Sequence, residues 1–136
     1  MKTNMATDRS QSDRLLRCGV SADTADMCYD SGALSLMDYD SAVHERDSRR
    51  ESYEVVPAWS LSRLLGLLPK RIKRGDCSDY TLNLSCDGCF WDLGYTYARY
   101  RGEDDSLVLF EDKDPKEVCV KTIEWLTANG YKLNEI

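Results

Sequence analysis

Alternating hydrophobic and polar residues predict two adjacent strands in the second half of the chain. Over residues 79–86 (DYTLNLSC) every second residue is apolar, and the same period returns over residues 90–100 (FWDLGYTYARY). A period of two places the apolar side chains on one face of a strand. An Asp-Gly pair lies between the two runs, and Asp-Gly is a strong signal for a two-residue turn. We therefore predict a β-hairpin in which Cys86 and Cys89 flank the turn as a cross-strand pair.

Helical periodicity appears in three other places. Residues 8–18 carry a short apolar stripe, Ser60 precedes a leucine-rich stretch that stops at Pro69, and Asp114 precedes a broad apolar stripe that stops at Gly130. Ser and Asp are favoured N-caps, and Gly commonly follows the last turn of a helix. The pattern predicts an N-terminal helix, a short leucine-rich helix and a C-terminal helix that covers the strands.

Residues 106–110 (SLVLF) supply a third strand. The predicted fold class is α+β: a small three-stranded antiparallel sheet, made of the hairpin plus one strand, packs against the C-terminal helix and the short leucine-rich helix. Residues 1–28 form an N-terminal helical segment and residues 54–136 the α+β core, the whole being one domain. Between them, residues 29–53 lose all periodicity and are rich in polar and charged side chains, which predicts a mobile connector.

Composition narrows the class of protein. The 136 residues are 42% hydrophobic and 31% charged, with a net charge of -6, which is typical of a globular domain. The longest apolar run falls short of the ~18 residues that a membrane span needs, and the N-terminus lacks the apolar centre of a signal peptide. We expect a soluble, cytoplasmic protein, and the acidic balance speaks against a general nucleic-acid binder.

One basic cluster interrupts the acidic chain. The leucine-rich helix is followed by Lys70, Arg71, Lys73 and Arg74. Cations at a helix C-terminus interact favourably with the helix dipole without any ligand, so we predict a solvated patch. Phosphate binding is the alternative, although neither interleaved aromatic residues nor a glycine-rich loop supports it. Because aromatic residues are enriched at interfaces, we add Tyr100 to these four cations as the predicted interaction surface.

The six cysteines are expected to be free thiols, mostly buried, because a cytoplasmic protein rarely holds structural disulfides. Cys86 and Cys89 have the spacing of a zinc-binding pair, but a zinc site needs a second pair. Only Cys77 and His44 could add ligands, and redox exchange at the pair is a further alternative. We therefore predict no metal and no cofactor, and keep Cys86, Cys89 and Cys77 as the candidate ligands should the chain bind zinc.

The sequence contains none of the common catalytic motifs. Its one histidine, His44, falls in the polar connector, so a nucleophile–base pair of the usual kind is not expected. Tyr95 and Tyr97 alternate on one strand and are expected in the core. We predict a non-enzymatic protein with an unknown protein partner, keep nucleic-acid association through the basic cluster as the alternative, and leave self-association open.

Three blocks of sequence carry a resemblance to a known family. They are TADM (residues 24–27), PAWSLSRLLGLLP (residues 57–69) and IEWLTANG (residues 123–130). In this order they resemble a family of small uncharacterised proteins from gut Bacteroides-type bacteria and their phages and mobile elements. The resemblance implies a single cytoplasmic α+β domain and an accessory factor of such an element, and it implies no activity. Cys86 and Cys89 depart from that family, whose hairpins usually lack the pair.

Overall fold

The computed structural model describes residues 5–74, 78–98 and 104–135. Four α-helices, one short 3-10 helix and seven strands follow one another along these residues. In chain order they are α1 (Arg9–Arg17), η1 (Ala22–Thr24), β1 (Met27–Asp30), β2 (Ala33–Ser35), α2 (Tyr39–Ser48), β3 (Val55–Ala58), α3 (Leu61–Leu67), β4 (Arg71–Arg74), β5 (Ser78–Asp87), β6 (Phe90–Ala98), β7 (Asp104–Asp112) and α4 (Pro115–Ala128). None of the described helices is long and apolar enough to cross a membrane.

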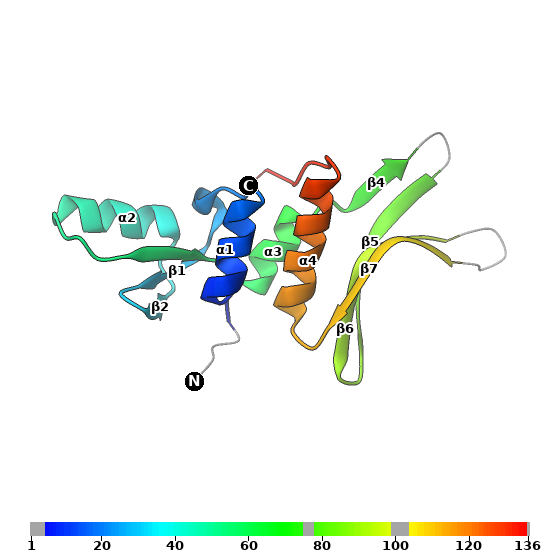
Figure 1. Ribbon diagram of the computed structural model, residues 1–136, viewed down its shortest axis with the longest axis horizontal. Helices are drawn as coiled ribbons and strands as arrows, with labels where there is room; N and C mark the ends of the chain where they lie inside the picture. Colours follow the sequence, from blue (N-terminus) through cyan, green and yellow to red (C-terminus); the bar gives the residue numbers. More distant parts are fainter. Residues whose placement is uncertain (1–4, 75–77, 99–103, 136) are drawn as a thin grey trace.

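The elements are arranged along an elongated body (Figure 1). A three-stranded antiparallel sheet, in the order β2-β1-β3, lies with α2 at one end, and a four-stranded antiparallel sheet, in the order β4-β5-β6-β7, lies at the other. The helices α1, α3 and α4 stand between the two sheets. The predicted α+β class is confirmed, but the sheets differ from the prediction: β4 adds a fourth strand, and the second sheet was not foreseen.

The β5–β6 hairpin predicted from the alternating pattern is present, with its turn one residue later than expected. Gly88 and Cys89 are the two loop residues, and Gly88 has a φ of +63°. Glycine adopts a positive φ without steric cost, and glycine at the first loop position is typical of a type II′ turn. Cys86 consequently pairs with Trp91, so the predicted cross-strand pair of Cys86 and Cys89 is wrong.

One face of the four-stranded sheet packs against α4 and forms most of the core. Leu93 and Tyr95 are fully buried on this face, and Tyr97 is half-buried beside them. From α4, Ile123 and Leu126 complete the contact without exposing any surface to solvent. The sequence prediction of an apolar sheet face covered by the C-terminal helix is therefore confirmed.

The helix boundaries follow the capping signals in the sequence. Asp8, Ser60 and Asp114 are the N-caps of α1, α3 and α4, and each side chain accepts a hydrogen bond from a backbone N–H of the first turn. Gly19 and Gly130, which follow α1 and α4, have φ angles of +91° and +79°. These are the left-handed conformations that favour glycine after a helix.

The sequence predicted a mobile connector over residues 29–53, whereas the structure gives most of these residues regular secondary structure. They contain part of β1, all of β2 and the helix α2. A small second core holds them together, made of the buried Cys28, Ala42 and Val55 with Tyr53 packed against it. The pattern was missed because α2 has almost no apolar face and buries only Ala42, while β1 is stabilised by pairing with β3, a segment about thirty residues further along.

Candidate functional site

The TADM block (residues 24–27) and the start of the PAWSLSRLLGLLP block (residues 57–69) contact each other in the structure. The carboxylate of Asp26 accepts hydrogen bonds from the backbone N–H of Ser60 at 2.9 Å and from its hydroxyl at 2.5 Å. The indole N–H of Trp59 donates to the hydroxyl of Thr24 at 2.9 Å, and Trp59 is fully buried. These residues connect the η1–β1 segment to the start of α3. The polar groups of these residues are used in packing.

A buried hydroxyl group extends this contact to the N-terminus. The Thr7 hydroxyl lies 2.8 Å from the hydroxyl of Ser12 and accepts the backbone N–H of Trp59 at 3.1 Å. The Thr7 carbonyl accepts the hydroxyl of Tyr29 at 2.8 Å. Each of these polar groups already has a protein partner, so we interpret them as structural contacts that stabilise the fold.

Ion pairs join α1 to α4. Both carboxylate oxygens of Glu117 lie 2.8 Å from Nη1 of Arg14, and Glu124 accepts from the same guanidinium. Nε2 of Gln11 donates to Glu117 and to Asp114, at 3.1 Å each. The hydrogen bonds that Arg14 donates to Glu124 and Glu117 outweigh the effect of burial and raise the pKa of Arg14 above its ordinary value. This cluster holds two helices together and leaves no open charge for a ligand.

Asp114 combines three roles at the start of α4. It caps the helix, accepts a hydrogen bond from Gln11, and lies 3.0 Å from Nζ of the buried Lys116. Burial opposes ionisation of this carboxyl, but the hydrogen bonds from Gln11 and Lys116 outweigh burial and lower the pKa of Asp114. The charged form of Asp114 is therefore part of the folded state.

An open groove of about 720 Å³ runs between α1 and β3, on the side opposite the basic cluster. Its rim carries Arg9 and Glu54, which form an ion pair with each other. Its floor is apolar, with Leu16, Val56 and Pro57 among the lining residues. His44 is exposed on α2 and is not among the lining residues. The groove therefore has a mixed lining, with apolar residues and charged residues of both signs.

The cysteines are distributed over different environments. Cys28 and Cys119 are buried free thiols, and burial raises the pKa of Cys119 to about 12. Cys86 and Cys89 are exposed at the tip of the β5–β6 hairpin, whereas Cys77 lies outside the described residues. Within the part of the chain that the structure describes, no three potential ligands come together in a way that could hold a metal ion.

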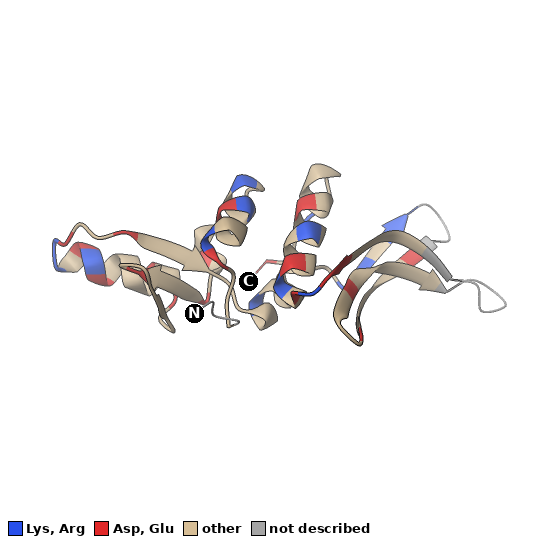
Figure 2. Cartoon of the chain, turned by 60° about the horizontal axis from the view of Figure 1, so that its bottom comes forward, with Lys and Arg blue, Asp and Glu red and all other residues tan. Residues whose placement is uncertain are grey.

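The basic cluster is placed differently from the sequence prediction. Residues 71–74 form β4, the outermost strand of the four-stranded sheet, and do not continue a helix. The blue patches on this strand in Figure 2 mark its cations. Arg71, Lys73 and Arg74 are exposed, and so is the preceding Lys70, while Ile72 is only 5% exposed and anchors the strand in the core. The prediction of a helix C-terminus is wrong because Pro69 ends the helical segment and pairing with β5 decides the rest. Tyr100, the fifth residue of the predicted surface, lies outside the described residues.

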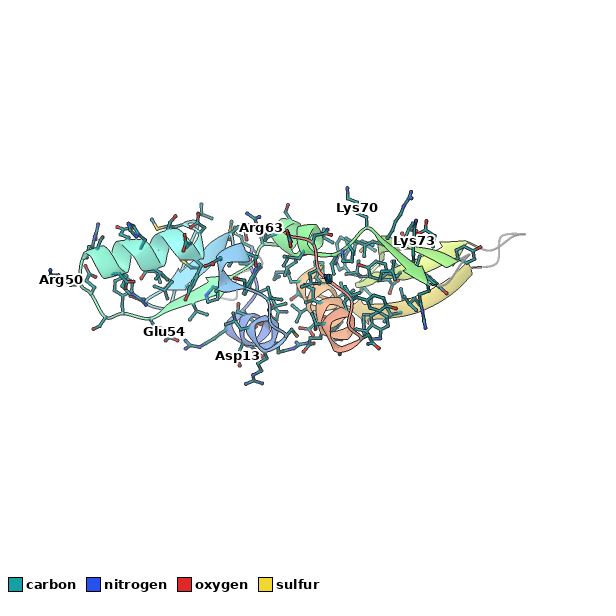
Figure 3. The ribbon with its side chains drawn as sticks, turned by 90° about the horizontal axis from the view of Figure 1, so that it is seen from above. Asp13, Arg50, Glu54, Arg63, Lys70 and Lys73 are labelled. Atoms are coloured by element: carbon teal, nitrogen blue, oxygen red, sulfur yellow. The ribbon has the colours of Figure 1, made fainter. Side chains whose placement is uncertain are left out.

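Charges along β4 are largely unneutralised by the described part of the chain. Arg71 lies 3.8 Å from Asp79, a distance at the limit of an ion pair. Lys70, Lys73 and Arg74 form no ion pair with any other described residue. Figure 3 shows that Lys70, Lys73 and Arg63 of α3 lie along one side of the molecule, opposite Asp13 and Glu54. Arg63 was not singled out from the sequence, because it is an isolated cation within the leucine-rich helix.

The hydrogen-bond register determines which backbone groups of β4 face outward. The carbonyl of Lys70 accepts the N–H of Leu82 at 2.9 Å, and Ile72 stands opposite Tyr80 in the same antiparallel ladder. Residues that bond to the neighbouring strand alternate in such a ladder. Lys70, Ile72 and Arg74 therefore bond toward β5, and the N–H and C=O groups of Arg71 and Lys73 point away from the sheet. Figure 1 shows no other described segment beyond this edge.

The segment that leads into β4 is held firmly. The buried Tyr95 donates its hydroxyl to the carbonyl of Pro69 at 2.7 Å. The side chain of Asn134 donates to the carbonyls of Gly66 and Leu68, at 3.1 and 2.9 Å. These bonds fix the turn between α3 and β4, so the outward-facing groups of β4 keep a defined geometry.

Along β5, the face of the four-stranded sheet turned away from α4 is polar and open. Thr81, Asn83 and Ser85 alternate along β5 and are exposed, and the amide of Asn83 donates to the hydroxyl of Thr96 at 3.3 Å. Arg71 stands opposite Thr81. The basic edge and this polar face thus form one continuous surface.

Comparison of the chain with protein-family models, with curated proteins and with solved structures finds no match.

Proposed function

We propose that the protein is a non-enzymatic interaction factor that binds another protein through the outer edge of its four-stranded sheet. The observation that carries the proposal is β4, an edge strand with three exposed cations in four residues. Its outward backbone groups can accept a further strand, a recurring mode of protein recognition. In keeping with the resemblance of its sequence blocks, we propose an accessory role in a phage or mobile element.

A nucleic-acid-associated factor is the second candidate. It is supported by the basic side formed by Arg63, Lys70 and Lys73 (Figure 3), because lysine and arginine neutralise phosphates. The net charge of -6 disfavours it, since the field of the whole chain repels a polyanion. Salt separates the two candidates. Binding through phosphate contacts weakens steeply with added salt, by roughly a thousandfold or more between 50 and 200 mM for six or more contacts.

Affinity capture from the native cell tests the proposal. The bait is the full chain, compared with the double variant Arg71→Gln, Lys73→Gln. The matched control, called the α2 variant, is Arg49→Gln, Arg50→Gln, which removes the two cations that directly follow α2 at the opposite end of the molecule. We expect a protein that resists nuclease treatment, is lost with the β4 variant and is kept with the α2 variant. Recovery of nucleic acid alone, or of copies of the chain alone, would contradict the proposal.

A further inference from the structure

We propose that β4 binds an acidic peptide segment, which adds to the sheet as a fifth, antiparallel strand and carries acidic side chains two residues apart. The inference rests on the proposed function and names the chemistry of the partner. Its basis is the coincidence of two features in the same residues. Arg71 and Lys73 point their backbone N–H and C=O groups outward, and their side chains lie together on one face of the sheet because strand residues two apart share a face.

The register dictates the pattern of the ligand. In an antiparallel pair, each residue with outward groups exchanges two hydrogen bonds with one residue directly opposite. The partners of Arg71 and Lys73 are then separated by one residue, and their side chains lie on the same face as the two cations. Opposite charges in such direct pairs are favourable. An acid-x-acid sequence therefore satisfies both the backbone and the charges, whereas two adjacent acids place only one on that face.

The edge is prepared for such an addition. Ile72, which lies between the two cations in the sequence, is buried on the other face of the strand. The Tyr95 and Asn134 hydrogen bonds hold the segment that precedes β4. A strand that is already ordered loses little conformational freedom on binding, which favours affinity. Cations on an edge strand also prevent two identical strands from pairing with each other. The same charges that exclude a second β4 are complementary to an acidic strand.

A proline substitution separates backbone recognition from simple charge attraction. Lys73→Pro removes an N–H that points to solvent, so it leaves the ladder with β5 intact, as proline does on sheet edges. Lys73→Gln removes the charge and keeps the N–H. The melting temperature and circular dichroism of both variants establish that the fold is retained. The α2 variant Arg49→Gln, Arg50→Gln again serves as the control for net charge.

The probe is a fluorescent peptide with the sequence Thr-Val-Glu-Val-Glu-Val-Thr, and binding is measured by anisotropy at 150 mM salt. Its first control moves the two glutamates to adjacent positions, and its second is N-methylated at both glutamates, which removes the N–H groups that would face β4. We expect binding of the alternating peptide, a loss of about 1.4-fold to fivefold with Lys73→Gln and a loss of at least about tenfold with Lys73→Pro. The N-methylated peptide should not bind, the adjacent-acid peptide should bind more weakly, and the α2 variant should bind as the wild type does.

Several results would overturn the inference. Equal binding by Lys73→Pro and the wild type, or by the N-methylated peptide, would exclude strand addition. Tighter binding of a twelve-nucleotide oligothymidine than of the peptide would favour a nucleic-acid site. Self-association that is lost in Lys73→Pro would identify a second copy as the occupant. If the protein captured from cells is still retained by Lys73→Pro while the peptide fails to bind, the proposed function stands and this inference fails.

Discussion

Substitution of Gly94 by alanine tests the closest approach of two strands in the four-stranded sheet. A Cβ atom at this position would lie 2.1 Å from the carbonyl oxygen of Val108, and 2.9 and 3.0 Å from Cα and Cδ1 of Leu109. Two of these three atoms belong to the backbone, so a change of rotamer cannot relieve the overlap. Strands β6 and β7 would have to separate beside the irregularity in their register at Tyr95 and Thr96.

Overpacking of this kind typically costs 1–3 kcal/mol, and the lower entropy of the unfolded alanine chain returns about 0.4–1 kcal/mol. Because backbone atoms must move, we expect a cost in the upper half of that range, so Gly94→Ala should lower the free energy of unfolding by about 1–2.5 kcal/mol net. Urea unfolding followed by tryptophan fluorescence measures it, with an unchanged m-value showing that the unfolded state is unaltered.

Gly66→Ala is the matched control for this experiment. Gly66 lies exposed within α3, and a Cβ there would meet no atom within 4 Å. The same chemical change should therefore raise the free energy of unfolding by about 0.5–1 kcal/mol, as expected when alanine replaces glycine within a helix. If Gly94→Ala also stabilised the protein, or left its stability unchanged, the described approach of β6 to β7 would be incorrect.

Three further predictions follow from the polar contacts and the thiols. Asp26→Ala, which removes two hydrogen bonds to the start of α3, should lower the free energy of unfolding by about 1.5–3 kcal/mol, and a thermal melt no lower than that of the wild type would contradict it. The lowered pKa of Asp114 means that its stabilising contribution is present above the ordinary pKa of 3.8 and is lost as the pH falls through the folded value. Unfolding free energies measured from pH 6 to pH 2 should thus fall more steeply for the wild type than for Asp114→Asn. At pH 8, a thiol reagent should modify the exposed Cys86 and Cys89 in the native protein, whereas Cys119, with its pKa raised to about 12 by burial, should react only after unfolding; peptide mapping that found Cys119 labelled first would refute this.

The parts of the fold that the sequence predicted are those set by local signals. The β5–β6 hairpin follows from alternation on both sides of a turn, and α4 from its cap, its proline and its apolar stripe. The position of the turn was missed by one residue because Asp-Gly and Gly-Cys are both acceptable two-residue loops. Pairing along the whole length of β5 and β6 selects between them, and a shift by one residue would turn every side chain to the other face.

The parts that were missed depend on partners far away in the sequence. β4 has a single buried residue, Ile72, and one apolar position cannot reveal a period. Likewise, β1 and β2 are too short to show alternation, and their pairing with each other and with β3 defines them. The contact between Asp26 and Ser60 cannot be seen in the sequence for the same reason, since the two residues lie 34 positions apart. Residues 24–27 and 57–60 complete each other's hydrogen bonding, through the contacts of Asp26 with Ser60 and of Thr24 with Trp59.

The location of charge, more than its total, determines what β4 can bind. A net charge of -6 repels an acidic partner at long range, but at physiological salt the Debye length is about 8 Å, so charges on α2 or α1 are screened from a ligand at the sheet edge. Within that distance the ligand meets Arg71, Lys73 and the outward backbone of the same residues, together with Asp79, which lies 3.8 Å from Arg71. Additional acids beyond the two paired positions should therefore add little affinity. Recognition at this edge depends on the register of two charges with four backbone groups, which is why a strand with alternating acids is favoured over a polyanion of higher charge.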